Sequence, residues 1–150
     1  MRCKPLDFLS LPVFLTLLCL AAVAAGETRT WDAGGDAINW FDPNNWDPNG
    51  IPADSDILTV LSGSPATTLE VRSDNGGSIT LDGSALAWFE TLNIGHSGSA
   101  ALSILNGASL SNTFGYVGYA AGSTGTVTVD GAGSTWDNLE IGRASCRERV

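Results

Sequence analysis

Oxygen-bearing side chains around a glycine are the first feature of this sequence that could do chemistry. Asn45, Asp47 and Asn49 alternate before Gly50, and Asp56 follows after five further residues. This order nearly fits the calcium loop D-x-[DN]-x-[DN]-G-x5-E, in which alternate oxygen ligands wrap a hard cation. However, Asn replaces the first Asp, Asp replaces the bidentate Glu, and no helical pattern flanks the loop. Since Asp-Pro, Asn-Gly and Pro also form consecutive turns, we expect turns here and no metal site.

His96 and Ser97 are the next candidates, because a histidine beside a serine suggests nucleophilic catalysis. His96 is the only histidine of the chain. No G-x-S-x-G motif surrounds Ser97, so the sequence does not predict a nucleophile elbow. The two residues lie in a Gly-His-Ser-Gly segment, which is typical of a turn. We therefore expect exposed turn residues at this position.

Asp82 and Asp130 are the more serious enzymatic candidates, since parallel β-helices include polysaccharide lyases and glycosidases that use acidic clusters. Both precede a glycine at the same phase of a repeat, and Asn106 occupies that phase in the repeat between them. Asp and Asn favour such turn positions for conformational reasons alone. No Lys or Arg follows Arg72 until Arg143, although a lyase uses such a base or charge stabiliser. We expect no catalytic residue, and likewise no cofactor-binding residue.

Aromatic residues near the ends of predicted strands could bind sugars by stacking, or could pack inside the fold. We expect them to serve mainly as core or cap residues. They are Trp88, Phe89, Tyr116, Tyr119 and Trp136.

The charge balance of the central segment excludes two classes of partner. Between residues 26 and 140 only Arg29 and Arg72 are cationic, against fourteen carboxylates. Nucleic-acid backbone and anionic lipid both require clustered cations. We therefore expect no nucleic-acid partner and no binding to a membrane surface.

Residues 1–25 have the pattern of a secretory signal peptide. Arg2 and Lys4 precede an apolar run, and the segment closes on small residues that a signal peptidase accepts. The alternative is an uncleaved membrane anchor, for which the apolar run is marginal in length. We expect a secreted or cell-surface protein without membrane insertion after cleavage.

Residues 141–150, with the sequence Ile-Gly-Arg-Ala-Ser-Cys-Arg-Glu-Arg-Val, break the pattern of the rest of the chain. This decapeptide resembles the translation of a common sequencing adapter, so we expect an adapter-derived tail and a longer natural chain. The alternative is a basic tail with a reactive thiol at Cys146. Cys3 and Cys19 lie in the signal segment, which leaves residues 26–140 without cysteine. No disulfide and no thiolate metal site are expected there.

Two interleaved repeats organise residues 73–140. The first has alternating strands beginning at Ile79, Leu102 and Val127, at steps of 23 and 25 residues, each ending in Asp-Gly or Asn-Gly. The second aligns residues 92–95 with 115–118 and 139–142. Such two-strand units bury themselves only by stacking. The pattern predicts an all-β fold, a β-solenoid resembling a parallel β-helix with repeats of about 24 residues. The alternative is a β-sandwich, which has similar strand spacing.

Residues 26–72 do not carry this repeat, and we expect them to form an atypical N-terminal capping segment. The terminal unit of a solenoid must cover the open end of the apolar stack. Trp31, Trp40 and Trp46 would supply that cover.

Two motifs resemble those of the PEP-CTERM-associated repeat proteins, which are secreted bacterial proteins similar to autotransporter passenger regions. They are the pairs Asn39-Trp40 and Asn45-Trp46 followed by Pro52 and Asp54, and the stretch 122–136. The resemblance covers about residues 29–142 and implies an extracellular β-helical protein without established activity. We expect the further repeats and the C-terminal sorting signal of that family to lie in the longer natural chain.

The expected function is that of a structural or adhesive surface protein without catalytic activity. Its expected partners are extracellular polysaccharide or cell-surface components. The alternative is the N-terminal part of a carbohydrate-active β-helix enzyme, a polysaccharide lyase or glycosidase.

Overall fold

The computed structural model describes residues 26–141, and the expectations for the signal peptide and for most of the adapter-like tail lie outside this range. The described chain is all-β apart from one short 3-10 turn, η1 (Pro43–Asn45). Its strands are β1 (Thr28–Trp31), β2 (Trp46–Asp47), β3 (Ile57–Gly63), β4 (Ala66–Ser73), β5 (Ser78–Ile94), β6 (Ser99–Leu105), β7 (Ser109–Val117), β8 (Thr124–Asp130) and β9 (Thr135–Ile141). No helix in residues 26–141 has the length and hydropathy needed to cross a bilayer.

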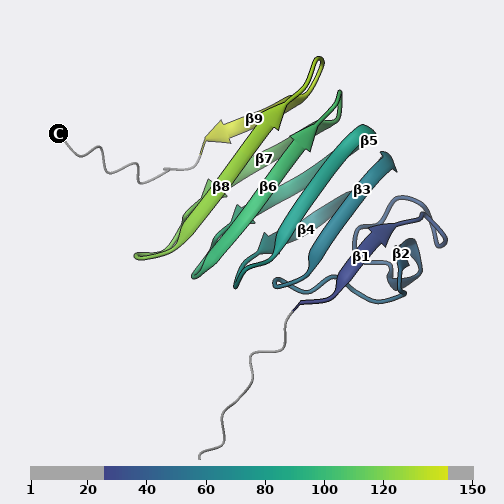
Figure 1. The fold of residues 1–150 in the computed structure, drawn as a ribbon, viewed down its shortest axis with the longest axis horizontal. Coiled ribbons are helices and arrows are strands. Elements are labelled where there is room, and N and C mark those ends of the chain that lie inside the picture. The colour runs from purple at the N-terminus through teal and green to yellow at the C-terminus, as the bar shows by residue number, and fades with distance from the viewer. Residues whose placement is uncertain (1–25, 142–150) are drawn as a thin grey trace, which may run out of the picture.

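The strands form a β-solenoid, as the sequence predicts. Sheet A consists of β1, β3, β5, β6 and β8 in parallel order, with the short β2 antiparallel at its edge. Sheet B consists of β4, β5, β7 and β9, also parallel. The chain alternates between the two sheets, which form the front and back layers in Figure 1. Strand β5, 17 residues long, bends and belongs to both sheets.

The register confirms the first repeat. Ile79 pairs with Leu102, and Leu102 pairs with Val127. The second repeat is correct in its first step, since residues 92–94 pair with 115–117. Its last step is wrong, because Ile141 pairs with Gly115 and not with Val117. The observed step is 26 residues, against 23 for the preceding one. The turn between β7 and β8 is two residues longer than that between β5 and β6, and the turn between β8 and β9 is one residue longer than that between β6 and β7.

The stack begins earlier than the sequence repeat indicates. Leu58 of β3 pairs with Ile79, and Val71 of β4 pairs with Leu92, so β3 and β4 already form a rung. The irregular part of the predicted capping segment is therefore confined to residues 32–56, called the cap segment below. This rung escapes sequence comparison because its turn contains Gly63 and Pro65 in place of the Asp-Gly or Asn-Gly signal.

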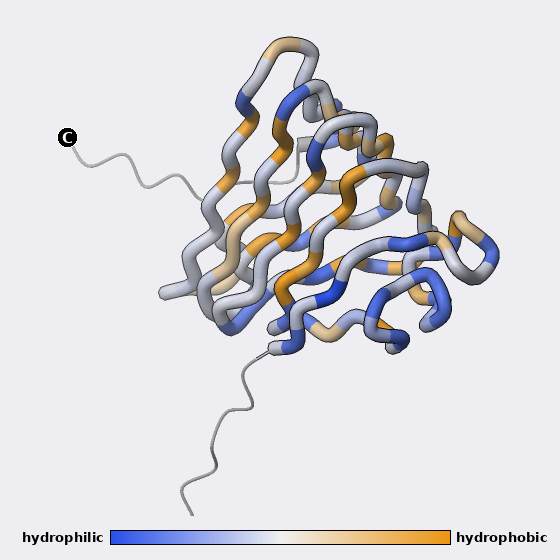
Figure 2. The backbone as a smooth tube through the Cα atoms, turned by 45° about the vertical axis from the view of Figure 1, so that its right-hand side comes forward, coloured by the Kyte–Doolittle hydropathy of each residue, from blue (hydrophilic) through white to orange (hydrophobic). Residues whose placement is uncertain are grey.

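The core lies between the two sheets and follows from the alternation of side chains along each strand. Apolar residues point inward at every second position and align from rung to rung. Figure 2 shows hydrophobic and neutral residues alternating along the strands, whereas the most hydrophilic residues gather in the turns and the cap segment. The fully buried members outside the cap include Leu58, Val60, Ile79, Leu81, Phe89, Leu92, Leu102, Ile104 and Leu110.

Three tryptophans pack at the N-terminal end of this core. Trp31, Trp40 and Trp46 are all buried. Trp46 packs edge-on against Trp40 with ring centroids 4.7 Å apart, and its indole N–H donates to the carbonyl of Trp40 at 2.8 Å. Trp40 also packs edge-on against Phe89, at 4.9 Å. The cap is thus an aromatic cluster joined directly to the solenoid core.

Candidate functional site

His96 and Ser97 lie in the turn between β5 and β6, where the sequence places them, but they have different surroundings. The Ser97 hydroxyl donates to Oδ2 of Asp74 at 2.6 Å, and the Ser97 and Gly98 amides donate to the same carboxylate at 2.9 and 2.6 Å. The His96 ring instead stacks on Tyr119, with centroids 5.0 Å apart. In a catalytic triad the histidine lies between serine and acid. Here the serine contacts the acid directly, so the group is not arranged as a triad.

Asp74 is a buried structural carboxylate that the sequence analysis did not find. It is 1% exposed. Burial raises the pKa of Asp74. The hydrogen bonds from the Ser97 hydroxyl and amide and from the amides of Gly98 and Asn75 lower the pKa by more than burial raises it, so the pKa lies below its usual value of 3.8. Asp74 therefore remains ionised at neutral pH and holds the next turn of the solenoid in place.

Two of the residues that resemble a calcium loop, Asn45 and Asp56, accept hydrogen bonds from backbone amides of the fold. Asn45 is buried, and its side-chain oxygen accepts from the amides of Gly35 and Ala37 at 2.9 and 3.0 Å. Its amide nitrogen donates to Asp36 at 2.8 Å. The Asn45 side chain therefore provides the cap segment with hydrogen bonds that backbone pairing provides elsewhere in the fold.

Asp56, the last member of that motif, is likewise a structural group. It is buried and accepts hydrogen bonds from the amides of Glu27 and Ala53 at 2.8 and 2.9 Å. Nε of the buried Arg29 lies 3.2 Å from Oδ2 of Asp56. Within residues 26–141, no three His, Cys, Asp or Glu side chains come together in a group that could hold a metal ion.

Asp82 and Asp130 stand in one column of sheet A, as the sequence suggests, but they are not neighbours. Leu105 lies between them, paired with both. Asn106 is one position further along and donates to Asp82 at 2.8 Å, while Asp130 accepts from the amide of Gly131. An intervening rung separates two carboxyl groups by about 9 to 10 Å. Both side chains serve turn hydrogen bonds at the edge of the stack.

The aromatic candidates divide into interior and exterior groups. Phe89 is buried in the core, and Trp136 is half-buried, with its indole N–H donating to Oδ1 of the buried Asn112 at 2.6 Å. Trp88 is half-exposed on sheet B. Tyr119 is 59% exposed and forms an edge contact with Tyr116 at 5.3 Å. Together with His96, these two tyrosines form the exposed aromatic cluster of the described chain.

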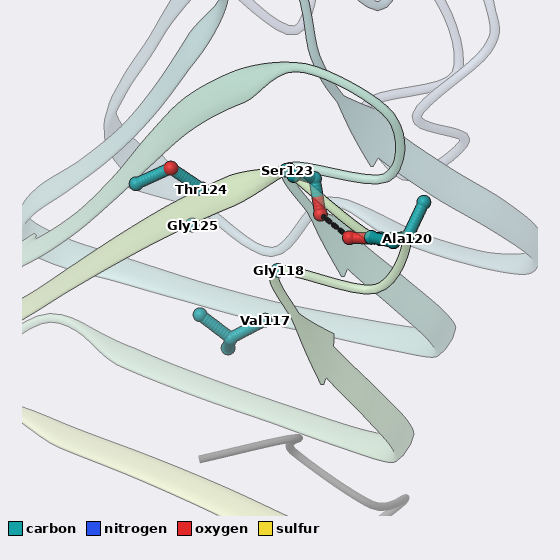
Figure 3. Close-up of a pocket in the computed structure, with 8 residues that line it drawn as sticks. Val117, Gly118, Ala120, Ser123, Thr124 and Gly125 are labelled. Atoms are coloured by element: carbon teal, nitrogen blue, oxygen red, sulfur yellow. Dashed lines mark hydrogen bonds between the residues drawn. The ribbon is translucent and has the colours of Figure 1, made fainter. Parts of the chain in front are cut away.

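An open hollow lies beside this cluster, at the turn between β7 and β8 (Figure 3). Its volume is about 570 Å³, and Val117, Gly118, Ala120 and residues 121–125 line it. The Ser123 hydroxyl donates across the turn to the carbonyl of Ala120 at 2.7 Å. No acid, base or cysteine lines the hollow, so its walls offer a potential ligand only hydroxyls, backbone groups and small apolar side chains.

The outward surface of sheet A has a regular pattern that the sequence analysis missed. Threonine or serine occupies the same position on five successive strands, in a row that we call the hydroxyl column. Its members are Thr30, Thr59, Thr80, Ser103 and Thr128. The alternation of Thr or Ser with apolar residues, which predicts the strands, also contains this row, because the hydroxyl residue recurs at the same position of each strand.

The fold defines a β-solenoid of about four turns, with about 23 residues in each turn. Comparison of the chain with protein families, with curated proteins and with solved structures finds no match.

Proposed function

We propose that this chain is a secreted or cell-surface β-solenoid with a structural or adhesive role and no catalytic activity of its own. We further propose that it is related to the PEP-CTERM-associated repeat proteins and to autotransporter passenger regions. The expected signal peptide and the repeat motifs support this assignment.

The observation that carries the proposal is the use made of the polar side chains in the turns. Asp74 holds the following turn, Asn45 and Asp56 hold the cap segment, and Asp82 holds Asn106. Groups that are occupied in this way maintain the stack and are not free to act as acid, base or nucleophile. A rigid stack with repeated outward side chains instead suits many weak contacts with an extended partner.

Extracellular polysaccharide or another cell-surface component is the proposed partner. Tyr119 and Tyr116 present aromatic surface on the outside of the solenoid, beside the half-exposed His96. Aromatic faces bind sugar rings by stacking, and the high exposure of Tyr119 leaves its ring accessible. The carboxylate-rich exterior favours neutral or cationic glycans over anionic ones.

Secretion and binding are tested with the full chain. Expression in a bacterial host followed by fractionation should place the protein in the medium or at the cell surface, and retention in the cytoplasm would contradict the proposed location. Binding is measured by sedimentation with insoluble chitin, cellulose and peptidoglycan. Y119A should reduce the bound fraction several-fold. L69A is the matched control, because Leu69 has similar exposure, 61%, but lies outside the aromatic cluster.

Two results would overturn the proposal. Equal binding by Y119A, L69A and the unchanged chain would remove the aromatic cluster from the adhesive role. Release of new reducing ends or unsaturated sugars from any of these glycans would show catalysis and would favour a carbohydrate-active enzyme.

A further inference from the structure

The hydroxyl column crosses the whole of sheet A. Its residues are separated in sequence by 29, 21, 23 and 25 positions, yet each pairs directly with the next across the sheet. The hydroxyl is thus retained at this position although the length of the turn changes. Further hydroxyl side chains, Thr28, Ser78, Thr124 and Thr126, stand on the same strands at alternate positions.

The surface around the column is almost without charge. The column and the row on its N-terminal side carry no charged residue, whereas the row on its other side carries Asp82 and Asp130, and Asp47 of β2 pairs with Thr30 at the sheet edge. The strands of sheet B, in contrast, carry Glu70, Arg72, Glu90, Asp137 and Glu140. For a segment with fourteen carboxylates, two uncharged rows that cross five strands are a marked asymmetry. Their complement is a neutral ligand.

The backbone fixes the spacing of this surface in two directions. Adjacent strands lie about 4.7–4.9 Å apart, and alternate residues along a strand lie about 6.6–6.8 Å apart. Threonine is stiff about its first side-chain torsion, so its hydroxyl and methyl groups keep their positions without ordering by a ligand. Cross-strand threonine pairs add to this order. The result is one continuous column of pre-positioned hydroxyls, with methyl groups at its threonines. The adjacent row adds the hydroxyls of Thr28, Ser78 and Thr126, with Ile57 and Ala101 between them.

A shallow groove of about 260 Å³ lies at the N-terminal ends of β5, β6 and β8, and no member of the hydroxyl column lines it. It is lined by Gly76, Gly77, residues 99–101 and the hydroxyl-bearing Ser78, Thr124 and Thr126. A groove with hydroxyl walls has room for a file of ordered water molecules, each held by several polar partners.

We propose that the outward face of sheet A binds ice. The two spacings of the face are close to the oxygen repeats on the prism surface of an ice crystal. A single hydroxyl gains little from ice, since liquid water forms the same hydrogen bond. Many fixed hydroxyls in register order several waters at once into positions that continue the crystal, and the methyl groups between them confine those waters.

Other ligands fit this face less well. No aromatic residue belongs to the hydroxyl column or to its flanking positions, so a sugar would find no ring on which to stack. Protein interfaces centre on large apolar and aromatic anchors. The column has none, and the exposed large apolar residues beside it, Ile57 and Leu61, both lie on the single strand β3. The proposed glycan contact at Tyr119 lies at the turn between β7 and β8, away from the hydroxyl column, so each proposal can be tested independently of the other.

The test compares the full chain with two matched variants. T80Y places a bulky, uncharged side chain in the middle of the hydroxyl column. T113Y places the same side chain at a half-buried threonine on β7, in sheet B. Tyrosine is a strong β-former, so both variants should fold, and circular dichroism with the melting temperature checks this. T128Y, at the more exposed end of the column, replaces T80Y if the latter does not fold.

The readouts are thermal hysteresis and the incorporation of fluorescent protein into a growing ice shell. The unchanged chain and T113Y should shape and enter ice, whereas T80Y should be excluded to the level of serum albumin. Exclusion of the unchanged chain, or equal incorporation of T80Y and T113Y, would overturn the proposal. Binding to crystalline cellulose or chitin that T80Y abolishes, without any effect on ice, would also overturn it and assign the face to a glycan.

Discussion

The carboxylate of Asp74 accepts a 2.6 Å hydrogen bond from the hydroxyl of Ser97, which lies 23 residues later and one turn further along the solenoid. Two backbone amides, those of Ser97 and Gly98, donate to the same carboxylate. Backbone bonds from Gly95 to Ser73 and from Gly76 to Ser99 join the same two turns, and the buried acid pairs the Ser97 and Gly98 amides between them. Successive turns are held together by this side chain as well as by the strands.

Replacing Asp74 with alanine should destabilise the fold. The variant leaves three donors of the next turn without their acceptor, and hydrogen bonds to a charged group contribute about 1.5–3 kcal/mol. We expect the free energy of unfolding to fall by about 3 kcal/mol, measured by chemical denaturation followed by tryptophan fluorescence. D137N, at an exposed position of β9, is the control and should unfold at nearly the midpoint of the unchanged chain. Equal midpoints for D74A and D137N would contradict the structural role.

Asp74 also predicts a dependence of stability on acid pH. Its pKa is lower in the folded chain than its usual value of 3.8. The unfolded chain therefore takes up this proton first, and the stabilisation is complete above about pH 4 and is lost as the pH falls through the folded pKa. The difference in unfolding free energy between the unchanged chain and D74N should shrink between pH 5 and pH 2. A difference that stays constant over this range would exclude a titrating Asp74 as its source.

Trp46 is expected to be the most sensitive position of the cap. It is fully buried between Trp31 and Trp40. W46A should reduce the free energy of unfolding by about 3–5 kcal/mol. It should also expose the end of the apolar stack, so that size-exclusion chromatography shows association. W88A is the control, since Trp88 is half-exposed and its loss should cost about 1 kcal/mol or less. A monomeric W46A of unchanged stability would show that the cap does not cover the core.

The strands could be predicted from the sequence, but the register of the last strand could not. Ile79, Leu102 and Val127 align in the sequence as they do in the sheet, because strand alternation and glycine turns are both visible in the residues. The predicted partner of Ile141 is wrong because the two longer turns before and after β8 shift the register without changing the local pattern. The register between strands depends on the length of the turn, and the recurrence of a glycine at the end of each strand does not determine that register.

The polar residues of the interior could not be found in the same way. Asp74 and Asn112 look like ordinary turn and strand residues in the sequence, but their partners Ser97 and Trp136 lie more than twenty positions away. Only the stacking of successive turns brings each pair together. Trp136 was thus correctly assigned to the interior side of its strand, while the group that receives its N–H was missed.

The calcium motif makes a prediction about metal removal. The oxygens of Asn45 and Asp56 already accept amide hydrogen bonds, so the fold should not need the ion. Adding chelator, or millimolar calcium, should leave the melting temperature unchanged. A site occupied at 100 times its dissociation constant would add about 2.7 kcal/mol of stability, which a melting curve resolves easily. A melting temperature that rises with calcium concentration would contradict the assignment.

N45A separates the two roles of this residue. Loss of its side chain leaves the amides of Gly35 and Ala37 unpaired and should cost about 2 kcal/mol, whether or not calcium is present. If Asn45 acted as a metal ligand, the loss would appear only in the presence of calcium.

Gly95 and Gly122 allow the close stacking of turns to be tested apart from backbone conformation. Both have positive φ, 72° and 84°. A Cβ atom at Gly95 would lie 2.5 Å from the carbonyl oxygen of Thr124 on the next turn, whereas one at Gly122 would meet no atom within 4 Å. Because both alanine variants carry the same conformational penalty, about 1–2 kcal/mol, any additional loss in G95A measures the contact between turns.

We expect G95A to unfold at a clearly lower denaturant concentration than G122A, with a further loss of about 2 kcal/mol from forced separation of the turns. The contact involves a backbone carbonyl that no side-chain rotation can move away. Hydrogen exchange should locate the extra loss in the amides of residues 94–98 and 118–125. Equal stability of the two variants would mean that adjacent turns can separate without cost, which is incompatible with a tightly stacked solenoid.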